Sequence, residues 1–204
     1  MPRLGMVIDL KRCIGCQACT LACKAEQGTP KGVFYTRVLE KEEGTYPNVK
    51  KTFVPVLCNH CQNAPCERVC PTGATSKRPD GVVLVDHNVC IGCRACYAAC
   101  PYNNRFFLAK GILSQGYFDN GLTPFERMKY GELQEGVVAK CTFCVERVEQ
   151  GLEPSCVNTC TAGARVFGDL DDADSEVSRL LRQRKGVQLL SECDTDPSVY
   201  YLWG

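Results

Sequence analysis

The sequence predicts an α+β fold built from two small cysteine-rich domains, one nested in the other, with long irregular loops. Three observations lead to this expectation. Of the 17 cysteines in the 204 residues, 16 fall into four sets of four at short, regular spacings. Two of these sets repeat nearly the same sequence 77 residues apart. Only 19 residues separate the second set from the third, so these two sets belong to one compact unit.

Cysteine at this density has three common causes, which are disulfides, zinc sites and iron–sulfur clusters. Disulfides fit poorly, because the count is odd and the repeated spacing of three residues does not cross-link loops. Zinc sites usually show separated C-x2-C pairs, often with histidine. The units here are a triplet plus one, and neither His60 nor His87 lies in an H-x3-5-H pair. The spacing therefore favours iron–sulfur clusters.

The motif at residues 90–101 reads CIGCRACYAACP and has the spacing of a bacterial ferredoxin. In two-cluster ferredoxins the first three thiolates of such a run hold one 4Fe–4S cluster and the fourth reaches a second cluster. One run therefore predicts a partner run. In chain order the four motifs are Cys13, Cys16, Cys19 and Cys23; Cys58, Cys61, Cys66 and Cys70; Cys90, Cys93, Cys96 and Cys100; and Cys141, Cys144, Cys156 and Cys160.

Short strands are expected to lead into the motifs, at residues 3–9, 33–38, 53–57 and 82–86. The internal repeat extends upstream of the cysteines, since Asp9 and Asp86 each stand four residues before the first cysteine of a motif. A helix is expected over 175–185, capped by Asp174 or Ser175 and with its apolar residues on one side.

The motifs divide the chain into an outer and an inner domain. The outer ferredoxin-like domain comprises residues 1–50 and 140–170, and the inner one residues 51–103. An aromatic-rich insertion follows at 104–139, and a C-terminal helix and tail at 171–204. Seven of the 17 aromatic residues fall within 102–139. That segment either covers the core of this chain or docks on a partner subunit.

Two pairings of the motifs are possible. In a tandem arrangement motif one pairs with two and three with four, whereas in a nested one two pairs with three and one with four. The 19-residue gap favours nesting, as does the proline that only motifs two and three keep, Pro71 and Pro101. The crossed-ligand rule then gives four ligand groups. They are group A (Cys13, Cys16, Cys19, Cys160), group B (Cys23, Cys141, Cys144, Cys156), group C (Cys58, Cys61, Cys66, Cys100) and group D (Cys70, Cys90, Cys93, Cys96).

Other residues of the motifs have expected roles toward the four 4Fe–4S clusters. Gly15 and Gly92 lie inside tight C-x2-C loops, where a backbone without a side chain can approach a cluster or adopt a left-handed turn. Apolar neighbours such as Ile14 and Ile91 are expected to pack against the clusters and exclude water. The basic residues that flank ligands, Arg12, Lys24, Arg94 and Lys140, are interpreted individually as solvated surface charges. Cys193 is left over as a tail thiol.

Composition and the remaining sequence exclude several functions. The net charge of +1 gives no strong field for nucleic acid or membranes. No apolar run is long enough to span a bilayer, and the N-terminus shows no export signal. No phosphate-binding glycine loop and no nucleophile–base pair is present. Because every motif thiol is assigned to a cluster, the chain is expected to transfer electrons without a catalytic site of its own.

The four motifs together resemble a known family. C-x2-C-x4-C-x3-CP as the second motif, CTFC…C-x3-C as the last, and GARVFGDLDD at 163–172 resemble the iron–sulfur subunits of the dimethyl sulfoxide reductase family. The resemblance covers nearly the whole chain, is weakest at 102–139, and is nearest to the small subunits of polysulfide/thiosulfate reductase and respiratory arsenate reductase. It implies nested pairing, and it implies that the group A cluster lies nearest the pterin cofactor of the partner.

The resemblance also implies partners and a cellular position. Such subunits bind a molybdenum or tungsten bis-pterin catalytic subunit and exchange electrons with a quinone-linked membrane subunit or another carrier. The chain is then expected at the periplasmic face after co-export with a catalytic subunit, or in the cytoplasm associated with a membrane. Two rival hypotheses remain. One is a free-standing polyferredoxin that shuttles electrons between soluble partners, and the other is a zinc-structured interaction module.

Overall fold

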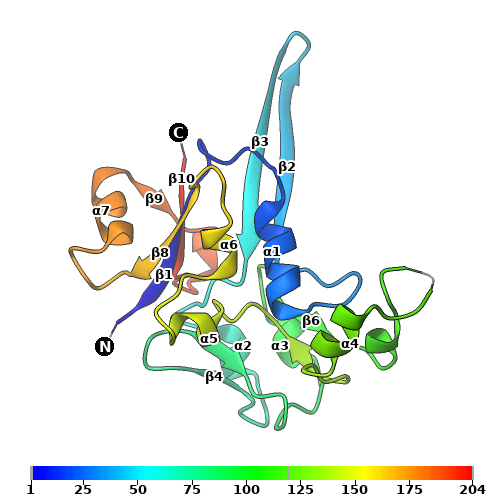
Figure 1. Cartoon of the computed structure of the whole chain (residues 1–204). Helices are drawn as coiled ribbons and strands as arrows, with labels where there is room; N and C mark the ends of the chain where they lie inside the picture. Colours follow the sequence, from blue (N-terminus) through cyan, green and yellow to red (C-terminus); the bar gives the residue numbers. More distant parts are fainter. Residues whose placement is uncertain (1, 119, 204) are drawn as a thin grey trace.

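A four-stranded sheet joins the beginning and the end of the chain. The structure is a computed structural model that describes residues 2–118 and 120–203. The sheet has the order β8-β1-β10-β9, with β1 at Leu4–Asp9, β8 at Arg165–Asp169, β9 at Gly186–Val187 and β10 at Val199–Leu202 (Figure 1). β1 is parallel to β10 and antiparallel to β8. The expected strand at 3–9 is confirmed, and it lies between two strands from the other end of the chain.

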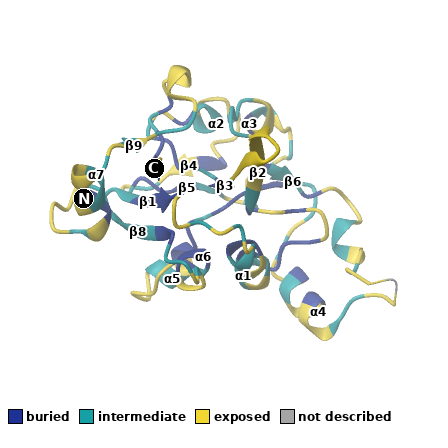
Figure 2. Cartoon of the chain, turned by 90° about the horizontal axis from the view of Figure 1, so that it is seen from above, coloured by how far each residue is buried: buried dark blue, intermediate teal, exposed yellow. Residues whose placement is uncertain are grey.

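β1 is apolar on both of its faces and is covered on both. Met6 and Ile8 point into the main core with Tyr201, and Val7 points to a second cluster under helix α7 (Glu176–Gln183). The expected helix at 175–185 is confirmed within two residues at its end. The Ser175 hydroxyl accepts the Ser178 backbone N–H at 3.2 Å, which caps the first turn. In Figure 2 β1 has the dark blue colour of buried residues.

The C-terminal segment is more than a helix and a tail. Residues 171–204 also supply β9 and β10, and the Tyr201 hydroxyl donates to the Pro55 carbonyl oxygen at 2.9 Å. Aromatic residues in the tail were visible in the sequence. The sequence does not show that these residues form an inner strand. The parallel partner of β10 is β1, about 190 residues away, and such a distant pairing leaves no local pattern.

The most prominent feature in Figure 1 is a hairpin that projects from the body of the molecule. It consists of β2 (Thr36–Thr45) and β3 (Asn48–Leu57), paired without interruption from Thr36–Leu57 to Thr45–Asn48. The strands expected at 33–38 and 53–57 are only its inner ends. The outer half is exposed and held by ion pairs of Lys51 with Glu40 and Glu42. Its charged sequence lacks the alternation that indicates a half-buried strand.

Short elements carry the cysteine motifs. The longest is α1 (Ala18–Gln27), which packs against α6 (Ser155–Asn158). In the middle of the chain α2 (Pro65–Arg68) packs against α3 (Ala95–Ala98), and between them run β4 (Thr75–Lys77) and β5 (Val83–Val85) as an antiparallel pair. The strand expected at 82–86 is therefore confirmed as β5. A last short helix, α5 (Val145–Val148), begins directly after Cys144.

The insertion is closed at its base by β6 (Phe106–Phe107) and β7 (Val138–Ala139), an antiparallel pair. It also contains a 3-10 turn at Ile112–Ser114 and α4 (Pro124–Tyr130), which begins with a capping box of Thr123 and Glu126. Tyr130 is buried, and the Tyr117 hydroxyl donates to the Thr29 carbonyl oxygen at 3.0 Å. The insertion therefore covers part of this chain, and several of its apolar side chains remain exposed: Phe118, Phe125 and Met128.

Candidate iron–sulfur sites

The four thiols of group A line one small cavity. Cys13 and Cys16 come from the loop between β1 and α1, Cys19 from the first turn of α1, and Cys160 from the turn after α6. The packing of α1 against α6 brings these distant segments together. The space between the protein atoms there, open solvent included, is about 340 Å³. The Ala164 N–H donates to the Cys160 sulfur at 3.2 Å, an interaction that stabilises a thiolate.

The four thiols of group C line a second cavity of nearly the same size, about 330 Å³. Cys58 and Cys61 follow β3, Cys66 lies in α2, and Cys100 follows α3. Burial and the neighbouring thiols raise the pKa of Cys61 to about 12. Such a thiol is a ligand only when a metal centre replaces its proton, since binding requires the thiolate. Two cavities of nearly equal size, each lined by four cysteines, fit two copies of one cofactor.

Group B lies deepest in the protein, and its four cysteines are buried. The pKa of Cys23 is raised by burial and by the neighbouring Cys156 and Cys144. The pKa of Cys141 is likewise raised well above its ordinary value, by burial and then by Cys23 and Cys58. These couplings join Cys23 to the thiols of motif four. They also make group B a neighbour of group C, through Cys58.

Group D is the most exposed of the four groups. Cys93 is exposed, and Cys70 and Cys90 are partly buried. The packing of α2 on α3 brings motif two alongside motif three. Burial raises the pKa of Cys70. Hydrogen bonds from the Thr75 N–H at 3.4 Å and from the Thr72 hydroxyl together outweigh this effect, so the pKa lies below its ordinary value.

The spacing of the thiols bears on the zinc hypothesis. A tetrahedral zinc site with Zn–S bonds of about 2.3 Å needs sulfur atoms roughly 3.8 Å apart. Within residues 2–118 and 120–203, no three His, Cys, Asp or Glu side chains converge closely enough to bind one metal ion. The four thiols of group A and the four of group C each line one cavity. Their chemistry fits the cluster, because thiolates are the ligands that iron–sulfur clusters take.

Both expected glycines adopt the left-handed conformation, with φ of +70° at Gly15 and +66° at Gly92. A Cβ at Gly15 would lie 2.4 Å from the ring of Phe53, and one at Gly92 would lie 2.0 Å from the Gly136 carbonyl oxygen. The protein atoms nearest to these positions therefore belong to the hairpin and the insertion. Both sites need glycine for backbone conformation and for close packing of a neighbouring segment.

Ile14 lines the group A cavity, as expected of a side chain that packs against a cluster, and the corresponding contact of Ile91 stays a prediction. Neither residue is buried in this chain, so the expected exclusion of water fails. They are 63% and 67% exposed, and each stands beside an exposed ligand thiol, Cys16 or Cys93. The surface interpretation of the flanking cations also fails at Lys140, which is only 3% exposed. A side chain that adjoins a ligand along the chain can point either way, and spacing alone does not decide which.

Two further buried cations, Arg105 and Arg165, were not expected from the sequence; they are 2% and 3% exposed. Arg165 opens β8 and lines the group A cavity, and Arg105 precedes β6 and lines the group C cavity. Arginine ordinarily points to solvent, so its presence in a short apolar stretch does not predict burial. The sequence around Arg105 and Arg165 contains no pattern that indicates their burial.

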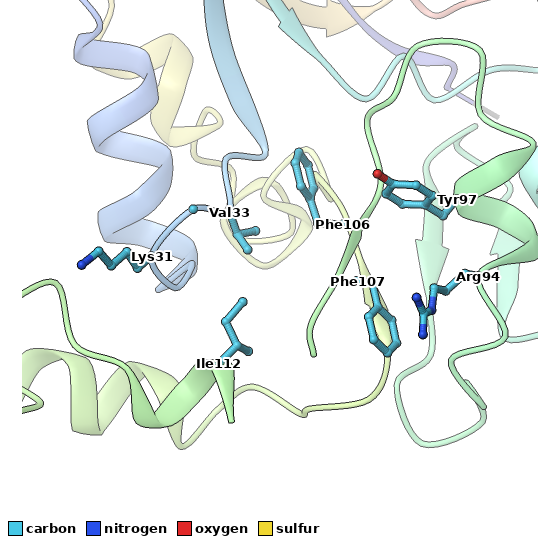
Figure 3. A pocket seen from close by; sticks show the side chains of 8 residues that line it. Lys31, Val33, Arg94, Tyr97, Phe106, Phe107 and Ile112 are labelled. Carbon is cyan, nitrogen blue, oxygen red and sulfur yellow. The ribbon is translucent and has the colours of Figure 1, made fainter. Parts of the chain in front are cut away.

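A separate surface pocket lies between α3 and the insertion (Figure 3). Arg94 stacks over Phe107, with the guanidinium carbon 4.2 Å from the ring centroid. The pocket is open and adjoins the loop of Cys93. Its lining contains no thiol, carboxylate or imidazole: Lys31, Gly32, Val33, Arg94, Tyr97, Phe106, Phe107 and Ile112. It is therefore a depression beside group D and no further metal site.

Fold and site together define an electron-transfer protein that carries four 4Fe–4S clusters. Residues 12–74, and again residues 49–115 and 120–170, match the description "4Fe-4S dicluster domain". The architecture is accordingly two ferredoxin-like dicluster domains of mixed α and β structure with short elements. Because the matches overlap at 49–74, they do not decide which motifs pair.

Known proteins similar to this chain over nearly its whole length are subunits of reductases. The iron–sulfur subunit of the arsenate respiratory reductase of Shewanella sp. is 41% identical over 98% of this chain and 96% of its own length. A subunit of the tetrathionate reductase of Salmonella typhimurium is 42% identical over 98% of this chain and 72% of its own length. A subunit of the selenate reductase of Mesobacillus selenatarsenatis is 42% identical over 97% of this chain and 70% of its own length.

The chain belongs to the iron–sulfur subunits of the dimethyl sulfoxide reductase family of molybdoenzymes. In that role it transfers electrons as one component of a multi-subunit molybdopterin oxidoreductase complex. Of the helices in the described parts of the chain, none has both the length and the apolarity needed to cross a bilayer.

Proposed function

We propose that groups A, B, C and D each hold one 4Fe–4S cluster and that the clusters form a single series in that order. When bound, they supply one-electron transfer. The proposal assigns groups A and B to an outer domain, residues 1–50 with 140–170, nested around an inner domain at 51–103. Its main support is the group A cavity, where Cys160 of motif four stands with three thiols of motif one.

Burial supports the order of the series. The thiols of group B are all buried, and Cys61 of group C is buried too, whereas Cys16 of group A and Cys93 of group D are exposed. Cys19 of group A raises the pKa of Cys156 of group B, after the larger effect of burial. Groups A and D are thus the two ends, where partners can come close to a cluster. The interior residues shield the middle of the series from water and oxidants.

The exposed end at group A is the proposed docking site of a molybdenum or tungsten bis-pterin catalytic subunit. Ile14 and the base of the β2–β3 hairpin lie at this end, since Val38 and Pro55 line the same cavity. The outer half of this hairpin is exposed, and an isolated two-stranded hairpin is only marginally stable in water. A subunit that packs on it explains its length. The related proteins named above are themselves components of reductases.

The exposed end at group D is the proposed contact for the second redox partner, a quinone-linked membrane subunit or another carrier. Ile91 and Tyr97 are exposed at this end. Tyr97 also lines the pocket of Figure 3. Two cellular positions suit this arrangement. They are the periplasmic face, reached with a signal-bearing catalytic subunit, and the cytoplasmic face of a membrane; protease protection in spheroplasts distinguishes them.

The repeat offers a matched pair of variants. Ile14→Asp should reduce the amount of catalytic subunit that co-purifies with the tagged chain. Ile91→Asp should leave that co-purification unchanged but lower electron transfer with the second partner. Leu190→Asp, at another exposed apolar position, is the control. Unchanged co-purification of the Ile14→Asp variant, or isolation of the unmodified chain from its native source as a lone monomer, would contradict the docking proposal.

A further inference from the structure

Three cations are buried inside this chain, and we call Arg165, Lys140 and Arg105 the inter-cluster cations. They are 3%, 3% and 2% exposed. Within residues 2–118 and 120–203 none of them forms a salt bridge with a carboxylate. Burying a charge without a counter-charge is costly, so such residues are almost always paired. The counter-charge must therefore come from another source.

Arg165 lies between groups A and B. One guanidinium nitrogen is 3.4 Å from the sulfur of Cys19 in group A, and the other is 3.6 Å from the sulfur of Cys156 in group B. Thr36 fixes the guanidinium by accepting a hydrogen bond at 2.8 Å. The two sulfur atoms thus lie on different nitrogens of the same guanidinium. The positive charge of Arg165 is therefore shared by two ligand groups.

Lys140 occupies the interval between groups B and C. Its ammonium donates at 2.6 Å to the carbonyl oxygen of Cys141, a ligand of group B. It also donates to the carbonyl oxygen of Val83, which lines the group C cavity. Two carbonyl groups orient the ammonium without neutralising it.

Arg105 occupies the interval between groups C and D. It lines the group C cavity and donates at 3.1 Å to the hydroxyl of Thr75. The backbone N–H of Thr75 in turn donates to the sulfur of Cys70 in group D. The second terminal nitrogen of Arg105 is buried without a hydrogen-bond partner in the described residues. An unpaired donor of this kind indicates that an anion completes the site.

We propose that each inter-cluster cation is the counter-ion of the two clusters on either side of it and raises the reduction potentials of both. A cluster with four thiolates is anionic, and each added electron makes it more so. A positive charge in a medium of low dielectric constant stabilises the reduced form. The inner groups B and C are each flanked by two of these cations and the end groups A and D by one. Arg165, Lys140 and Arg105 are thus positioning residues that act through the clusters.

The inference rests on the ligand groups of the proposed function and is tested by redox titration of the intact complex followed by EPR. One Cys→Ser variant per group first assigns each signal. Arg165→Gln should move the midpoint potentials of groups A and B to more negative values and leave that of group D unchanged. Arg105→Gln should do the same for groups C and D and leave group A unchanged. Arg165→Lys and Arg105→Lys should restore most of each shift.

Arg94→Gln is the matched control. Arg94 is likewise an arginine near group D, directly after Cys93, but it is exposed and lies over Phe107. This variant should shift group D less than Arg105→Gln does. Unchanged potentials in the two Gln variants, or equal shifts of all four signals, would overturn the inference. If a Gln variant fails to assemble four clusters, full assembly of its Lys variant supports the role of charge, and failure of both overturns it. Iron content and the number of signals test the ligand groups separately.

Discussion

Asp9 and Asp86 make the same contacts at equivalent positions of the internal repeat. The carboxylate of each accepts the N–H two residues further on, from Lys11 at 3.0 Å and from Asn88 at 2.9 Å. The carbonyl oxygen of each accepts the N–H of the first motif cysteine, four residues on, at 3.2 and 3.0 Å. The aspartates therefore shape the entry to motifs one and three. Asp9 alone also binds a cation, Arg184, through both of its oxygens.

The pair of Asp9 and Arg184 predicts a pH dependence. Burial raises the pKa of Asp9, but hydrogen bonds from Arg184 and the Lys11 N–H together outweigh this effect. The pKa therefore lies below the ordinary value of 3.8. Its contribution to stability is therefore complete above that value and is lost as pH falls through the lower, folded-state pKa. Asp9→Asn should lower the free energy of unfolding by about 1–3 kcal/mol. In denaturant titrations this difference should stay constant from about pH 8 to pH 5; a decline within that range would be inconsistent with the pair.

Phe143 supports the buried group B. It is 1% exposed, stacks on His60 with ring centroids 3.8 Å apart, and meets Phe167 edge-on at 5.3 Å. Phe143→Ala should lower the free energy of unfolding by about 3–5 kcal/mol, because it opens a cavity. It should also speed the loss of cluster absorbance in air. Phe118→Ala, at a 69% exposed position, should change stability by less than about 0.5 kcal/mol. Similar effects of the two variants would refute this account of Phe143.

Gly92 and Gly73 separate backbone strain from close packing. Both have positive φ, +66° and +69°, but only a Cβ at Gly92 would meet backbone, the Gly136 carbonyl oxygen at 2.0 Å. Nothing lies within 4 Å of a Cβ at Gly73. Gly73→Ala should therefore cost roughly 1–2 kcal/mol of left-handed strain. Gly92→Ala should cost more and should reduce iron in group D, as measured by iron content and EPR. Equal costs would show that packing against the insertion is unimportant.

Cys160 and Cys193 test the ligand assignment. Cys160→Ser should remove or convert one of four cluster signals, the same one that Cys16→Ser affects. Cys193→Ser should leave all four signals and about sixteen iron atoms per chain, four for each cluster. Cys193 is exposed, so its substitution also serves as a control for handling of the protein. If Cys160→Ser and Cys16→Ser affect different signals, the nested pairing is wrong.

Local patterns were enough to find the four cysteine-rich segments, which the dicluster-domain matches cover, because most cysteines of one motif lie a few residues apart. Which thiols share a cluster stays a prediction. Local patterns also predicted β1, β5 and α7, whose apolar residues alternate or recur with the period of the element. The outer half of the β2–β3 hairpin carries no such signal, since both of its faces are solvated and charged. β10 was missed because its pairing with β1 joins opposite ends of the chain.

The surroundings of the clusters were predicted less well. Ile14 and Ile91 are apolar and adjacent to ligands, which suggested burial, yet they stand at the exposed ends. Arg105, Lys140 and Arg165 carry charges, which suggested solvent, yet they are buried. The two errors have different causes. A side chain next to a ligand can point inward or outward, and ordinary rules for burial assume an interior without the anionic clusters that make buried cations acceptable.

The most direct test of the account is an anomalous density map at the iron edge from crystals of the intact complex. The account predicts four compact iron clusters in series, and it predicts that the sulfur of Cys160 is bonded to the same cluster as those of Cys13, Cys16 and Cys19. A cluster that joins these three thiols to Cys70, or single metal ions at the four sites, would contradict it.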